Sequence, residues 1–153
     1  MGEFPEIGDK LPNDKLLVIF DGRCGFCNGT IRWFLRRDQH DRLRFAPAES
    51  LKVAELLARN SLGPLDSPTQ PDTVIGVSDP GGPNEQIFLR SDAAVAMLSR
   101  LPRPWPVVAT ACGLIPRSLR DLGYRLVACF RYRIWGWLAA CPIPSAEERA
   151  HFL

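Results

Sequence analysis

Residues 16–27 read LLVIFDGRCGFC, and this stretch decides the fold that we expect for the chain. Its first five residues are apolar and partly β-branched, which is typical of a short strand buried on both faces. Asp21 and Gly22 end the run, and a Cys-x-x-Cys motif, Cys24 to Cys27, follows at once. Apolar residues at 27, 31, 34 and 35 then recur at helical spacing. The stretch therefore predicts a strand that leads into a helix over 24–37, with the motif at their junction.

The segments after this junction continue the alternation of strands and helices. The expected elements are a strand at 43–45, a helix from Ser50 to about 60–63, strands at 73–77 and 86–90, and a helix from Ser91 to Leu101. We expect residues 51, 54, 57 and 58 on the inner side of the second helix, and 94, 95, 98 and 101 on that of the third. The order βαβαββα predicts a mixed α/β sheet with helices on both faces.

Two further helices are expected after this unit, one between Pro106 and Pro116 and one from Arg117 to about Trp137. Apolar residues at 119, 122, 126, 130, 134 and 137 keep a helical period, so we expect this row to be buried in the same core. Residues 145–148 fit a capped final turn. The region from Ser99 to Trp137 holds seven arginines and one acidic residue, Asp121. This charge is interpreted as a solvated helix face or, alternatively, as a patch for an acidic partner or membrane surface.

The composition is that of one globular domain. The chain has 153 residues, of which 46% are hydrophobic and 24% charged. We assign residues 1–15 to an N-terminal arm and 16–153 to a single domain. A net charge of +2 gives no reason to expect nucleic acid as a partner, and membrane contact is not expected because no apolar run reaches 18 residues. The polar start of the chain does not resemble a secretory signal, so a cytoplasmic location is predicted.

The Cys-x-x-Cys pair is the one short cysteine spacing in the chain, which has five cysteines in all. At a helix N-terminus, unpaired N–H groups and the positive end of the helix dipole favour a thiolate, and Arg23 adds a positive charge beside Cys24. The residue three positions later turns back toward the sheet. We therefore expect Cys24 to be the attacking thiol and Cys27 the resolving one.

A Cys-x-x-Cys pair also occurs in metal sites, haem attachment sites and structural disulfides. A zinc site or an iron–sulfur cluster needs two further ligands, and no second short cysteine spacing supplies them. Haem attachment requires His after the second cysteine, where this chain has Asn28. A purely structural pair stays possible. We expect no metal and no cofactor, and we expect Cys112, Cys129 and Cys141 to be small core residues.

Asp21 has two interpretations. It can hold the turn at Gly22 through side-chain-to-backbone hydrogen bonds, or it can accept the proton of the second thiol during exchange. A carboxylate close to Cys24 would raise the pKa of that thiol and oppose the helix dipole. The position of Asp21 relative to the two sulfurs decides between these interpretations.

The segment Phe20–Asn28 resembles the signature of the DCC family of thiol-disulfide oxidoreductases, also known as domain of unknown function 393. The stretches at 44–47, 90–94, 132–133 and 144–149 resemble that family as well, so the likeness covers nearly the whole chain from Leu16. It implies a thioredoxin-like fold and a disulfide oxidoreductase whose site residues are Asp21, Cys24 and Cys27. The expected partner is a disulfide- or thiol-bearing protein or a small thiol.

One feature departs from ordinary thioredoxins, which place a cis-proline directly before the third strand, facing the cysteine pair. Here that strand is expected to begin at Thr73, and Asp72 precedes it. Either Asp72–Thr73 supplies the substrate-docking backbone, or Pro71 acts from one position earlier. Gly22, Arg23, Asp72 and Thr73 are therefore candidate supporting residues. The competing function is a non-catalytic thioredoxin-like binding module that uses the arginine-rich C-terminal helices.

Overall fold

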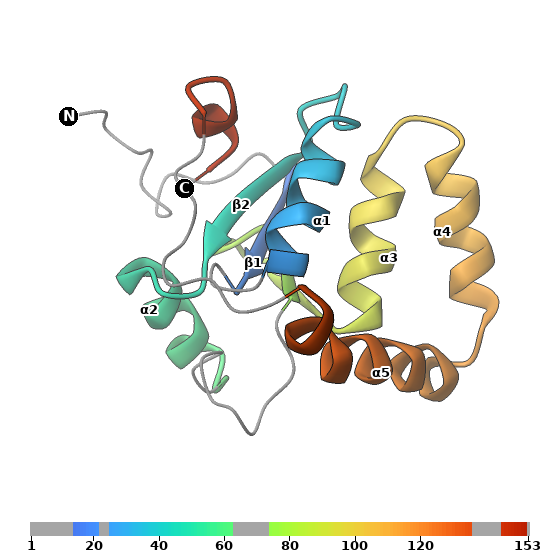
Figure 1. Ribbon diagram of the computed structural model, residues 1–153. Helices are drawn as coiled ribbons and strands as arrows, with labels where there is room; N and C mark the ends of the chain where they lie inside the picture. The colour runs from blue at the N-terminus through green and yellow to red at the C-terminus, as the bar shows by residue number, and fades with distance from the viewer. Residues whose placement is uncertain (1–13, 22–24, 63–73, 136–144, 153) are drawn as a thin grey trace.

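A computed structural model of the chain describes residues 14–21, 25–62, 74–135 and 145–152. The elements follow the predicted order βαβαββα, and further helices come after it (Figure 1). They are β1 (Leu16–Phe20), α1 (Gly25–Leu35), β2 (Leu43–Pro47), α2 (Leu51–Arg59), β3 (Val74–Ser78), β4 (Gln86–Leu89), α3 (Ser91–Arg100), α4 (Trp105–Leu114), α5 (Arg117–Trp135) and the short 3-10 helix η1 (Glu148–His151). Of the predicted N-terminal arm, residues 1–13 lie outside the described part, and Lys15 Nζ pairs with Asp41 at 3.1 Å.

The four strands form one mixed sheet in the order β2-β1-β3-β4. β1 pairs with β2 in parallel, because α1 returns the chain to the end of the sheet at which β1 begins. β1 pairs with β3 antiparallel, and β3 and β4 form the expected hairpin. In this register Phe20 lies opposite Val74, so the end of β1 meets the start of β3. The thioredoxin-like mixed α/β fold expected from the sequence is confirmed.

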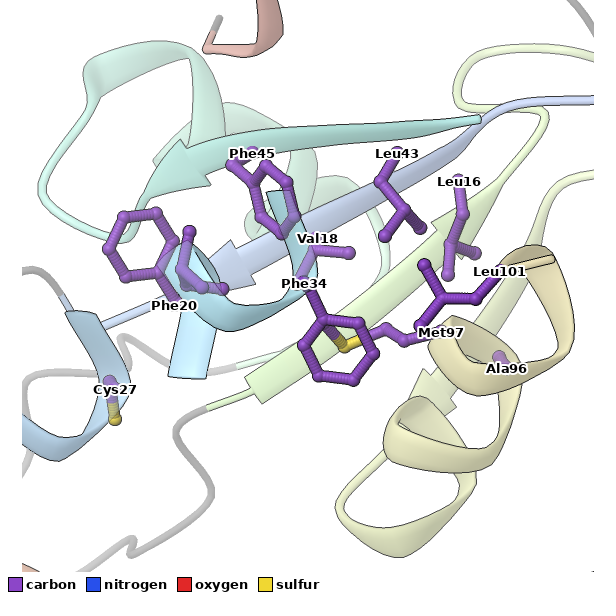
Figure 2. Close-up of a cluster of buried hydrophobic side chains, with 11 residues drawn as sticks. Leu16, Val18, Phe20, Cys27, Phe34, Leu43, Phe45, Ala96, Met97 and Leu101 are labelled. Carbon is purple, nitrogen blue, oxygen red and sulfur yellow. The ribbon is translucent and has the colours of Figure 1, made fainter. Parts of the chain in front are cut away.

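β1 lies at the centre of the core, since all five of its residues are buried. Successive side chains point to opposite faces of a sheet. Leu16, Val18 and Phe20 therefore pack on one side with α1 and α3, as Figure 2 shows, while Leu17 and Ile19 pack on the other side with α2. The prediction of helices on both faces is confirmed.

Helices α4 and α5 lie outside the layer that α1 and α3 form. α4 packs along α3, and α5 crosses near α1 and α3 (Figure 1). The buried Ser91 hydroxyl donates a hydrogen bond to Asp121 of α5. Arg117 and Arg120 of α5 pair with Asp92 of α3 at 3.1 and 3.0 Å. Polar contacts thus link α5 to the start of α3. Among the described residues, no helix is both long enough and apolar enough to span a bilayer.

The expectation that the apolar row of α5 is buried was wrong. Leu119, Leu122, Leu126, Phe130 and Ile134 are 48–64% exposed, and Trp137 lies outside the described residues. The helix packs instead through the opposite side, where Ala128 is buried and Tyr124 half-buried. The reason is that α1 and α3 already cover this face of the sheet, so α5 meets helices and not a bare sheet.

The inner faces of two other helices also differ from the expected ones. α2 buries Val53, Leu56 and Leu57, so Leu57 alone of its four predicted positions is buried, and Leu51 is 84% exposed. α3 buries Ala93, Ala96 and Met97, and Leu101 after it is buried as predicted, whereas Ala94, Val95 and Leu98 are half-buried. The expectation for the cysteines fails at Cys129, which is exposed, while Cys112 is half-buried and Cys141 is outside the described residues.

The C-terminal turn forms as predicted. Ser145 and Glu148 bond reciprocally: the Ser145 N–H donates to Glu148 Oε2 at 2.9 Å, and the Glu148 N–H donates to Ser145 Oγ at 3.3 Å. This capping box starts the turn that leads into η1. Phe152 then packs against the rings of Phe20 and Phe45. The tail thereby covers the edge of the core beside β2.

Candidate active site

The predicted motif lies where β1 ends and α1 begins. Asp21 follows the last residue of β1 and is half-buried, and Cys27 is the third residue of α1. Gly22, Arg23 and Cys24 lie outside the described residues, so the geometry of the cysteine pair is not part of the structure. Asp72 and Thr73 also lie outside it. Val74, which follows them directly, pairs with Phe20, so the third strand does begin beside the motif.

Cys27 is the member of the pair whose surroundings the structure describes. It is 4% exposed and belongs to the cluster that β1, α1 and α3 bury together. Figure 2 shows it on the first turn of α1, at the end of the cluster near Phe20. The first turn of α1 contains no acidic residue that would offset the positive end of the helix dipole. A thiol so placed is poorly accessible to bulk solvent.

An apolar cavity of about 370 Å³ adjoins Cys27. Its walls come from α1, α3, α4 and α5 and include Phe26, Cys27, Ala94, Val95, Gly123 and Ala128. It is bounded by the very residues of α3 that the sequence placed on an inner face, since Ala94, Val95 and Leu98 line it. The volume falls within the range of about 300–1,000 Å³ that small-molecule pockets occupy.

Sequence reasoning missed this cavity and the residues of α4 and α5 that line it, such as Cys112, Tyr124 and Val127. The signal that could have revealed it is a set of small residues, Ala94, Gly123 and Ala128, on helices otherwise rich in large side chains. Small side chains on facing helices permit either close packing or a gap. The sequence does not distinguish the two, because the outcome depends on how far apart the helices lie.

A second group of polar residues, Asp38, Asp41 and His151, has the ligand types of a metal site within 4.8 Å of one another. Its carboxylates already have partners. The Arg42 and Leu43 N–H groups donate to Asp38 at 3.0 and 2.8 Å, and Arg44 Nη1 donates to Asp41 at 2.6 Å. The hydrogen bond from Arg44 holds the pKa of Asp41 far below its ordinary value. We interpret this group as a brace for the start of β2.

Comparisons with known proteins agree with the resemblance in the sequence. The chain is 29% identical over 145 residues to an uncharacterized protein of Bacillus subtilis, YuxK, covering 95% of this chain and 97% of that one. It is 27% identical over 135 residues to the chloroplastic DCC family protein At1g52590 of Arabidopsis thaliana, covering 88% of this chain and 71% of that one. No solved structure matches. The family model of the DCC1-like thiol-disulfide oxidoreductases matches residues 18–137, and the chain therefore belongs to this family.

Proposed function

We propose that this protein is a thiol–disulfide oxidoreductase that works through Cys24 and Cys27 without a cofactor. The observation that carries the proposal is the placement of Cys27, buried on the first turn of α1 directly after the central strand β1. A helix N-terminus favours the thiolate form of a cysteine there, and Cys24 precedes the helix by one residue. Membership of the DCC1-like family supports the same activity.

The proposed reaction consists of two exchanges. The Cys24 thiolate attacks one sulfur of a substrate disulfide, which forms a Cys24–substrate disulfide and releases the other substrate sulfur as a thiolate. The Cys27 thiolate then attacks Cys24, which forms the Cys24–Cys27 disulfide and releases the second substrate thiolate. The substrate gains two electrons and the protein loses two. A second thiol-bearing protein or a small thiol reduces the pair again, and with an oxidant the direction reverses.

The places of the supporting residues in the chain suggest a role for each of them. Asp21 lies directly after β1, where it can hold the turn at Gly22 or accept the proton of Cys27 as that thiol becomes nucleophilic. Arg23 would favour the Cys24 thiolate. Asp72 and Thr73 precede Val74, which lies opposite Phe20, so their backbone is the proposed docking edge for the substrate. The odd number of five cysteines suits a reducing compartment, and we propose the cytoplasm.

The assignment of roles is tested by trapping mixed disulfides on single variants. We expect Cys27→Ser to attack a substrate disulfide and stall as a covalent adduct, because no second thiol resolves it. We expect Cys24→Ser to trap no adduct. Cys129→Ser, which replaces an exposed cysteine on α5, is the matched control and should behave as the natural protein. Non-reducing gels and peptide mass spectrometry give the readout. Adducts on Cys24→Ser in place of Cys27→Ser would reverse the assignment.

A non-catalytic binding module is the second candidate function. The observation that favours it is the exposed apolar row of α5, Leu119 to Ile134, with the exposed Arg125 and Arg133 beside it. Large exposed apolar patches mark interaction surfaces in soluble proteins. A module of this kind would need no redox-active pair, so a redox titration of Cys24 and Cys27 separates the two candidates.

A further inference from the structure

We propose that the cavity beside Cys27 receives the apolar arm of the substrate, and that the preferred substrates are small disulfides carrying an uncharged aliphatic or aromatic group. The proposal rests on the proposed function, and it assigns a substrate class to that site. Cys27 forms part of the cavity wall, so a molecule seated there lies next to a reacting sulfur. A cavity of about 370 Å³ has room for a short alkyl chain or one or two rings.

The polar side chains that line the cavity already have partners within the protein. The Thr30 hydroxyl donates to the Phe26 carbonyl at 2.9 Å, and the Ser91 hydroxyl donates to Asp121. Arg120 pairs with Asp92 at 3.0 Å and donates from Nε to the Ile115 carbonyl at 3.2 Å. A polar group that enters the cavity would lose its hydrogen bonds to water and would meet side chains whose hydrogen bonds are already made. An apolar group has no such hydrogen bonds to lose. The cavity therefore selects for apolar groups.

Two glycines on the outer helices bear on the test of the cavity. Gly123 of α5 lines the cavity and is exposed. A Cβ atom added at Gly123 would meet nothing within 4 Å. A larger side chain at this position can occupy the open space without a clash at Cβ. Gly113 of α4 has equally open surroundings but does not line the cavity.

In the reaction the arm is carried by one sulfur of the substrate disulfide. The Cys24 thiolate attacks that disulfide, one S–S bond breaks and one forms, and the departing thiolate takes the electron pair. Resolution by Cys27 then releases the arm-bearing thiolate from a position beside the cavity. Binding of the arm raises the local concentration of the disulfide next to the pair and so raises the rate of the first step.

Two measurements on the full chain test the proposal. The first is binding of the non-reactive alcohols butanol, hexanol and octanol, followed by amide shifts of cavity residues in NMR spectra. The second is the rate of reduction of disulfides with methyl, butyl or hexyl arms by the reduced protein. We expect both affinity and rate to rise by about three- to fourfold per methylene until the cavity is full.

The variant Ala94→Leu adds three carbons at the wall of the cavity on α3 and should weaken hexanol binding by roughly 30- to 60-fold, at three- to fourfold per carbon. It should also shorten the range of chain lengths over which affinity and rate rise. Alanine and leucine both have high helix propensity, so the fold should be kept. Gly113→Leu places a leucine away from the cavity, is the control and should leave both series unchanged. Gly123→Leu on α5 serves as the second variant.

The outcomes separate this proposal from the proposed function. Reduction of all the disulfides at one rate, with no effect of Ala94→Leu, would overturn the substrate class and leave the oxidoreductase intact. Failure to reduce any disulfide, the methyl compound included, would overturn the oxidoreductase itself. The alcohol series is independent of redox chemistry, so alcohol shifts that do not map to the cavity would overturn the binding site in either case.

Discussion

Helices α2 and α5 both carry apolar residues at helical spacing, yet they meet their surroundings in opposite ways. α2 buries Val53, Leu56 and Leu57 against one face of the sheet, with exposed fractions of 0–3%. α5 leaves its row from Leu119 to Ile134 about half exposed and packs through Ala128 on the other side. The difference follows from the position of each helix, since α2 covers a bare sheet face whereas α5 lies outside α1 and α3.

Helical periodicity predicts that a helix forms, but it does not predict which of its sides the rest of the protein covers. An apolar row identifies a helix and the side of that helix whose exposure to water is unfavourable. It does not identify which element covers that side, because coverage depends on the layers already present. In this protein the side of α5 that packs also borders the cavity beside Cys27, so the same arrangement that exposes the row creates the candidate substrate pocket.

The largest expected effect comes from truncating one leucine in each helix. Leu57→Ala in α2 should lower the free energy of unfolding by about 2–5 kcal/mol, because it removes a buried side chain and leaves a cavity. Leu126→Ala in α5, where the leucine is 54% exposed, should change it by less than about 0.5 kcal/mol. Urea unfolding followed by circular dichroism measures both.

A large loss of stability for Leu126→Ala would contradict the exposure of this side of α5. A loss similar to that of Leu57→Ala would mean that the row of α5 is covered in solution. Repeating the unfolding over a wide range of protein concentration then shows whether a second copy covers it, since a dimer becomes more stable as concentration rises.

A smaller effect is expected at the contact that links α5 to α3. Ser91→Ala removes the hydroxyl that donates to Asp121, and should lower the free energy of unfolding by about 1–2 kcal/mol at pH 7. The Ser91 hydrogen bond holds the pKa of Asp121 below its ordinary value. The bonded carboxylate therefore adds stability above its unfolded pKa of about 3.9, and this is lost as the pH falls through its lower folded pKa.

The cost of Ser91→Ala should consequently shrink as the pH falls below about 5, through the unfolded pKa of Asp121 and then through its lower folded pKa. Ser99→Ala is the matched control, because it makes the same substitution in the same helix at an exposed position. The Ser99 hydroxyl donates to the Ala96 carbonyl at 2.7 Å and does not contact Asp121 through that bond. We expect it to change the free energy of unfolding by less than about 0.5 kcal/mol. A cost of Ser91→Ala that stays constant with pH would show that Asp121 does not contribute through this bond.

The sequence was sufficient to predict the sheet and its order of elements because β1 is buried on both faces and the turns carry strong signals. It also gave the correct inner face for α1, where Cys27, Ile31 and Phe34 are buried. It failed for α2, where Leu51 and the two alanines looked as apolar as Val53 and Leu56. Leu51 has the same volume as the buried Leu56, so the buried side there depends on how the helix is turned against the sheet, which periodicity does not determine.

The candidate site was predictable in its cysteine and not in its pocket. The spacing of Cys24 and Cys27 and the strand before them are local features, and the structure places Cys27 on the first turn of α1 as expected. The cavity depends on contacts between α1, α3 and α5, which are far apart in the chain. Gly123 and Ala128 acquire a role only through these long-range contacts, so no local pattern identifies them.

A redox titration of the full chain tests whether Cys24 and Cys27 form the proposed redox-active pair. The full chain is equilibrated in thiol–disulfide buffers from roughly −320 to −120 mV, the range that cellular systems span, and each cysteine is quantified by differential alkylation and mass spectrometry. We predict one two-electron transition within this range that involves Cys24 and Cys27 together, with Cys129 titrating independently. A pair that stays in one state across the whole range would contradict the account and favour a binding module.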